Sequence, residues 1–244
     1  MKTVLAIFRR EAFAYLTTPT AYVFVAVFLF ALNLFTFQAG RFFDLGRADL
    51  QAFFYYHPWL FVVFLPAISM RLWAEDARSG VIETLLTLPA PTWALVLGKF
   101  LAAWAAAGVA LALTVPLWIT VNALGHPDNG AIVAAYLASL LMAGGYLAIG
   151  SAMSALTKAQ VAAFVLAVLV AFLFTAAGSP LVLDFARQAF GAEGADMIAN
   201  LSVLQHFDAA QHGVIEARAI FYFLSLIGLF LGFTILAVDA RRGS

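Results

Sequence analysis

The 244-residue chain is 64% apolar and only 11% charged, whereas a soluble domain is about half apolar and about a quarter charged. The polar shell of a soluble protein of this length could not cover that much apolar surface, so the composition predicts an integral membrane protein. The 13 basic and 13 acidic residues cancel, which argues against a nucleic-acid binder. The lack of cysteine excludes disulfides, thiol catalysis and cysteine-ligated metals.

The first 17 residues have the pattern of an amphipathic helix. Apolar residues recur at helical spacing on one face, and Lys2, Arg9 and Glu11 lie off it. The apolar face comprises Val4, Leu5, Phe8, Ala12, Tyr15 and Leu16, and we assign Phe8, Arg9 and Arg10 to a helix lying in the cytoplasmic interface. A cytoplasmic extension of the first membrane span is the alternative. Pro19 is expected to break the helix, and the lack of a signal-peptide pattern predicts an uncleaved first span.

Six later segments are apolar enough to cross about 30 Å of hydrocarbon, which takes roughly 20 helical residues. They are Thr18–Ala39, Phe53–Met70, Trp93–Val121, Ala131–Met153, Val161–Gly178 and Ala219–Val238. Lys99 lies inside the third segment, where its long side chain can snorkel to the interface. Small residues that favour close helix packing gather around the end of the fourth span, namely Gly144, Gly145, Gly150, Ser151 and Ser154. We expect one all-α membrane domain over residues 1–244.

Basic residues in the connections predict the orientation, because cytoplasmic loops carry an excess of Lys and Arg. With the N-terminus inside, the cytoplasmic side holds Lys2, Arg9, Arg10, Arg71, Arg78, Lys99, Lys158, Arg241 and Arg242. The external side then holds Arg41, Arg47, Arg187 and Arg218. This imbalance predicts that both termini lie in the cytoplasm.

Motifs for catalysis are absent from the sequence. It contains no GxxxxGK[ST] loop for nucleotide phosphates, no HExxH zinc motif and no GxSxG nucleophile elbow. The four histidines, His57, His126, His206 and His212, are scattered near the predicted external boundaries, where solvated or interfacial side chains are favoured over a metal site. We therefore expect no enzymatic activity, no catalytic residue, and no metal or cofactor bound by this chain.

The connection Arg71–Pro91, between the second and third spans, concentrates charge on the cytoplasmic side. Arg71, Glu75 and Arg78 are spaced to pair along a helix, and Gly80 can end it. A second, apolar helix follows with Ile82, Leu85 and Leu86, and ends before Pro89 and Pro91. The residues fit equally a helical hairpin that docks a soluble partner and a solvated loop that obeys the positive-inside rule.

The external connection Ser179–Arg218 is also too long for a plain turn. It contains two apolar runs at helical spacing, Leu181, Phe185 and Phe190, then Met197, Ile198, Leu201 and Leu204. Gly191 and Gly194 separate the runs. The pattern predicts two short external helices that lie on or dip into the outer leaflet.

The cytoplasmic segment resembles the signature of ABC type-2 transporter permeases. The matching residues are Glu75, Arg78, Gly80, Glu83, Leu85, Leu86, Leu88, Pro89, Gly98 and Lys99, with Val81 where Thr is usual. A second stretch resembles GldF-like permeases, with NosY-type permeases as close relatives. It comprises Leu201-Ser202, His206-Phe207, Gly213-Val214-Ile215 and Tyr222-Phe223-Leu224-Ser225.

The resemblance implies a permease subunit in the bacterial inner membrane that works with two ABC ATPase subunits, which bind ATP and Mg²⁺ and perform the hydrolysis. It also implies a second permease, identical or paralogous, and a GldG-like auxiliary protein with an external domain, as in gliding-motility-type systems. The ATPase-coupling residues would be Glu75, Asp76, Arg78, Gly80, Glu83, Leu86 and Pro89. His206, Phe207 and Gly213 would contact the external partner. The alternative function is a membrane anchor that transmits the ATPase-driven change without moving cargo.

Overall fold

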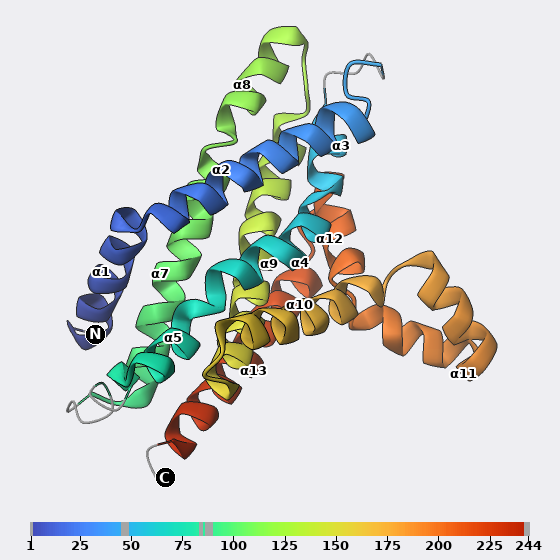
Figure 1. The fold of residues 1–244 in the computed structure, drawn as a ribbon. Coiled ribbons are helices and arrows are strands. Elements are labelled where there is room, and N and C mark those ends of the chain that lie inside the picture. Colours follow the sequence, from blue (N-terminus) through green and yellow to red (C-terminus); the bar gives the residue numbers. More distant parts are fainter. Residues whose placement is uncertain (1, 45–48, 83–84, 86–89, 242–244) are drawn as a thin grey trace.

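The computed structural model describes residues 2–44, 49–82, 85 and 90–241, and these residues form helices and connections without strands. The helices are α1 (Lys2–Thr17), α2 (Pro19–Leu34), the π-helical turn η1 (Phe35–Ala39), α3 (Gln51–Tyr55), α4 (His57–Ser69), α5 (Arg71–Ser79), α7 (Thr92–Ala112), α8 (Val115–Leu124), α9 (Asn129–Leu156), α10 (Gln160–Ala176), α11 (Pro180–Asn200), α12 (Val203–Gln211) and α13 (Ala217–Ala240). Both chain ends lie at the end of the bundle that carries α5, and α3 and α8 lie at the opposite end (Figure 1).

Four helical segments of the described chain are long and apolar enough to cross a membrane. They are Pro19–Ala39, Thr92–Leu124, Asn129–Leu156 and Ala217–Ala240, and α10 with α11 makes a fifth if this pair, bent by 73°, is one span. The predicted second span, Phe53–Met70, is divided between α3 and α4, and α4 alone has 13 residues. The structure thus confirms an all-helical protein with apolar spans, and the count of six remains a prediction.

Two helix boundaries lie where the sequence predicted them. Thr18 is extended between α1 and α2, and Pro19 begins α2, as the proline predicts. Gly80 has a φ of 74°, the left-handed conformation that glycine adopts without a steric penalty, and it ends α5. The helix over the first 17 residues is therefore a separate element, distinct from the first span.

Helix α9 is the central element of the bundle, and it packs against α4, α5, α7, α10, α12 and α13. Its small residues permit this, as predicted. A Cβ atom on Gly144 would lie 2.8 Å from Ile227 of α13, and one on Gly145 would lie 2.9 Å from Leu226. On another side of α9, a Cβ on Gly150 would lie 1.7 Å from Ser69 Oγ, at the end of α4. Backbones approach closely at both contacts because the glycines lack side chains.

The two predicted helical runs fall mainly in α11, which bends at Gly191, and the second run continues to Leu204 in α12. Their location on the external side stays a prediction. Ala186 and Ala195, one on each side of the bend, are buried. Phe185, Phe190 and Met197 are exposed, and Leu181 is 82% exposed. The bent helix projects sideways from the bundle, at the right of Figure 1. Helix α11 therefore forms a projecting arm that exposes several large apolar side chains.

Candidate functional site

Helix α5 is a short charged helix at the end of the bundle where both termini lie. Within it, the guanidinium of Arg71 donates two hydrogen bonds to Glu75, from Nε at 2.7 Å and from Nη2 at 3.1 Å. This pair matches the predicted spacing of four residues. It also lowers the pKa of Glu75, because the Arg71 hydrogen bond favours the ionised carboxylate.

Two serines of α9 hold the start of α5 through hydrogen bonds. The indole Nε1 of Trp73, which is fully buried, donates to Ser151 Oγ at 3.0 Å. The amides of Trp73 and Ala74 donate to Ser154 Oγ at 3.1 and 3.0 Å, and that hydroxyl donates to the Met70 carbonyl at 2.8 Å. Ser154 thus satisfies two of the amide groups that the first turn of a helix leaves without partners. A helix held in this way is packed against the bundle, which excludes the solvated-loop interpretation for α5.

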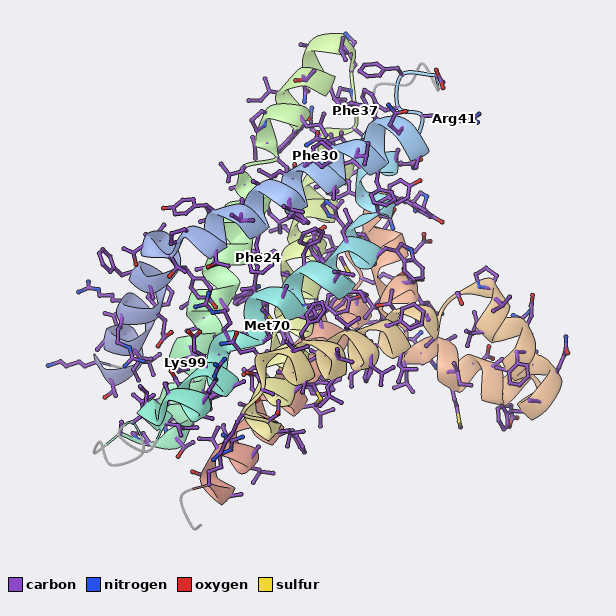
Figure 2. All side chains as sticks on the ribbon, in the orientation of Figure 1. Phe24, Phe30, Phe37, Arg41, Met70 and Lys99 are labelled. Carbon is purple, nitrogen blue, oxygen red and sulfur yellow. The ribbon has the colours of Figure 1, made fainter. Side chains whose placement is uncertain are left out.

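A buried ammonium group joins α5 to two further helices. Lys99 Nζ, on α7, lies 2.8 Å from Asp76 Oδ2 of α5 and 3.2 Å from Glu11 Oε1 of α1. It also lies 5.4 Å from the ring centroid of Trp73, within the range of a cation–π interaction. The Lys99 side chain is only 4% exposed, and Figure 2 places it among these helices. We call Glu11, Asp76 and Lys99 the Lys99 cluster.

Gly98 explains how α1 comes close enough to complete the cluster. A Cβ atom on Gly98 would lie 2.7 Å from Ile7 Cγ2 and 3.2 Å from the Val4 carbonyl oxygen, too close for any other residue. The glycine therefore lets α1 lie directly on α7, and the next residue, Lys99, then reaches Glu11. The Gly-Lys pair that the sequence singled out thus has a structural basis in this contact.

Two expectations about these residues were wrong. Lys99 does not snorkel to the interface, because its ammonium is neutralised inside the protein by two carboxylates. Glu11 is not off the packing face of the first helix; it faces α7, whereas Leu5 and Leu16 are exposed. Asp76, one of the predicted coupling residues, points into the bundle at Lys99. The only sequence signal for the cluster was a lysine inside a span, which requires a carboxylate partner when it is buried.

The remaining residues of the predicted coupling segment differ in exposure. Arg78 and Gly80 are exposed, and Glu75 is half-buried. Glu83, Leu86 and Pro89 lie outside the described residues. In α1, Arg9 and Arg10 are exposed and Phe8 is half-buried. Among the described residues, the exposed surface of this site is therefore the end of α5 together with α1.

The predicted external contact residues differ in burial. His206 and Phe207 are buried, and the His206 ring stacks on Tyr222 with centroids 3.9 Å apart. They position α12 and are not available to a partner in this arrangement. Gly213 is exposed, with a φ of 86°. His57, expected to be solvated or interfacial, is instead fully buried, with its Nδ1 2.8 Å from Ser139 Oγ.

The charge state of Glu11 gives the Lys99 cluster a predicted pH dependence. Burial raises the pKa of Glu11, but attraction to Lys99 and a hydrogen bond from Arg10 outweigh it, so the pKa lies below the usual 4.5. The stabilisation that ionised Glu11 gives to the folded protein is thus complete above pH 4.5, and it is lost as the pH falls through the lowered pKa of Glu11. Hydrogen exchange of the α1 amides, corrected for intrinsic rates, should increase in that acid range. Glu11→Gln should remove this increase in exchange at acid pH. An increase of the same size in that variant would contradict the assignment of the pH dependence to Glu11.

No group of three or more His, Cys, Asp or Glu side chains suited to a metal ion is found among the residues that the structure describes. The site is a junction of α1, α5, α7 and α9 that is held by hydrogen bonds and buried charges. Comparison with curated proteins gave no match. A family model described as ABC-2 family transporter protein matches residues 32–242, which include α5 and Lys99 but not α1. Since that match covers most of the chain, the protein belongs to the ABC-2 transporter family, the membrane permease components of ATP-binding cassette transporters.

Proposed function

We propose that this chain is the permease subunit of an ATP-driven transporter and that α5 receives the motion of a separate ATPase subunit. The observation that supports this most strongly is the attachment of α5 at its inner face, through Trp73 and Asp76, while its other end at Arg78 is exposed. A force applied to the exposed end is transmitted to the helices that hold the inner face.

The attachments distribute that motion over three helices. Ser151 and Ser154 connect α5 to α9, the central helix of the bundle. Lys99 connects it to α7 and, through Glu11, to α1. Because packed helices have discrete arrangements and do not deform continuously, a shift of α5 would favour a different arrangement of the whole bundle. The segment with Glu83, Leu86 and Pro89 would complete the surface that meets the ATPase.

The remaining features of the proposed assembly follow from the family and the charge pattern. Two ATPase subunits would bind ATP and Mg²⁺, and a second permease, identical or paralogous, would complete the path. The GldF-like assignment adds an external GldG-like partner. The proposal keeps the predicted six spans and both termini in the cytoplasm of a bacterial inner membrane. The location of both chain ends on the α5 side supports an even number of spans (Figure 1).

Charge reversal on the exposed end of α5 tests this docking surface. Arg78→Glu is expected to reduce the amount of co-expressed ATPase subunit that co-purifies with the permease by about tenfold, since misplaced like charges at an interface cost more than 1 kcal/mol. Arg187→Glu is the matched control, because Arg187 is equally an exposed arginine but lies on the external arm α11. Wild-type recovery of the ATPase with Arg78→Glu, at normal permease yield, would refute the docking role.

A second candidate function is a membrane anchor that passes the ATPase-driven change to an external protein without moving cargo. The exposed apolar side chains of α11, Phe185 and Met197 among them, favour it, because such an arm suits a protein partner. ATP hydrolysis that is stimulated by an external partner in proteoliposomes, with no cargo accumulating in the lumen, would favour the anchor. ATP hydrolysis that is coupled to accumulation of cargo in the lumen would favour transport.

A further inference from the structure

An open groove of about 770 Å³ lies between α1 and α7. Its lining is apolar except for one lysine, and comprises Lys2, Val4, Leu5, Phe8, Trp93, Leu97, Leu101, Trp104, Ala105, Gly108 and Leu140. The volume is within the range of about 300–1,000 Å³ that ligand sites occupy. None of these residues belongs to the Lys99 cluster or to α5, so the groove is separate from the proposed coupling site.

The length of the groove matches one leaflet of a bilayer. Trp93 and Gly108 lie about 22 Å apart along α7, from the rise of 1.5 Å per helical residue. Half of the hydrocarbon core measures about 15 Å, and the headgroup region adds several ångströms. A groove that begins at the start of α7 and ends at Gly108 and Leu140 therefore extends from the interface to about the bilayer midplane.

The lining of the groove offers the two kinds of contact that an anionic phospholipid needs, a positive charge and apolar surface. Trp93, at the shallow end, is 51% exposed, and tryptophan is enriched at the membrane interface. Lys2 supplies the one positive charge of the lining. Deeper in the groove, the indole N–H of Trp104 is satisfied by the Leu140 carbonyl at 2.7 Å, so this part offers apolar contact and no free donor.

We propose that this groove binds a single anionic phospholipid of the cytoplasmic leaflet. Its acyl chain lies along α7 as far as Gly108, and its phosphate pairs with Lys2. Burial of the acyl chain provides the affinity, and the lysine provides the preference for an anionic headgroup. The proposal needs only that α7 enters the membrane from the cytoplasmic side at Trp93, and it holds whether or not α5 couples to an ATPase.

Native mass spectrometry of the purified full-length chain tests the site, with phosphatidylglycerol and phosphatidylcholine of identical acyl chains as probes. The wild type should retain one phosphatidylglycerol per chain and bind it about fivefold or more tightly than phosphatidylcholine. Lys2→Glu should abolish that preference. Arg9→Glu is the matched control, since Arg9 is exposed on the same helix but does not line the groove.

Variants that fill the groove test the acyl-chain part. Ala105→Trp and Gly108→Leu should reduce retention of both lipids about tenfold or more, because each CH₂ kept out of an apolar site lowers the affinity about fourfold. Gly108→Ala should retain lipid, since the added Cβ makes only an ordinary contact, 3.5 Å from Leu140. Equal effects of Lys2→Glu and Arg9→Glu, or unchanged retention in both filling variants, would overturn the proposal.

Discussion

Replacing Lys99 with methionine is expected to lower the free energy of unfolding of the permease by about 3 kcal/mol. The methionine keeps the length and apolar character of the lysine stem but removes the ammonium. Asp76, whose side chain is only 18% exposed, would then carry an uncompensated negative charge. The 15%-exposed Glu11 would keep only its pair with Arg10 and would repel Asp76. Unfolding in mixed detergent micelles with increasing dodecyl sulfate, followed by tryptophan fluorescence, measures the loss.

Two controls separate a buried charge from an ordinary salt bridge. Arg71→Met breaks the pair with Glu75, whose side chains are 34% and 44% exposed, and should cost less than about 1 kcal/mol. The triple variant Glu11→Gln, Asp76→Asn and Lys99→Met removes all three charges, and should recover most of the stability that the single change loses. If Lys99→Met costs no more than Arg71→Met, or if the triple variant is less stable than Lys99→Met, the Lys99 cluster does not have the proposed electrostatic role.

The Lys99 cluster also shows which part of the site the sequence could not predict. The ends of α1 and α5 depend on Pro19 and Gly80, whose backbone preferences act locally, and both were predicted correctly. The pairing of Lys99 with Glu11 and Asp76 depends on three helices meeting, and no local pattern encodes that meeting. Periodicity even placed Glu11 off the packing face, because an acidic residue counts as polar whether it faces water or a buried lysine.

The second predicted span shows a related limit of sequence reasoning. The second predicted span is apolar throughout, but its helices end at Tyr56 and at Met70, although both residues keep right-handed helical angles. Hydropathy averages over such interruptions and cannot detect them. The small residues of α9, in contrast, were interpreted correctly as packing surfaces, because a run of glycine and serine in an apolar helix has few other uses.

Gly150→Ala is expected to destabilise the permease by about 2–3 kcal/mol, near the upper end for overpacked cores. The new methyl group would lie 1.7 Å from Ser69 Oγ and 2.7 Å from Ser69 Cβ. Ser69 cannot move aside freely, because it is fully buried and its hydroxyl donates to the Leu65 carbonyl at 2.9 Å. The ends of α4 and α9 must therefore separate at the point where α5 begins. The same dodecyl sulfate titration measures the effect.

Gly232→Ala provides the matched control, because a Cβ at Gly232 of α13 meets nothing within 4 Å. There the same substitution should be neutral or stabilise by about 0.5–1 kcal/mol, the usual gain from replacing a helical glycine. Adding Ser69→Gly to Gly150→Ala removes both clashing atoms and should restore most of the loss, apart from the cost of a glycine in α4. If Gly150→Ala behaves like Gly232→Ala, then α4 and α9 are not held in close contact at Ser69. Motion of α5 would then reach α9 through its hydrogen bonds to Ser151 and Ser154 and not through α4.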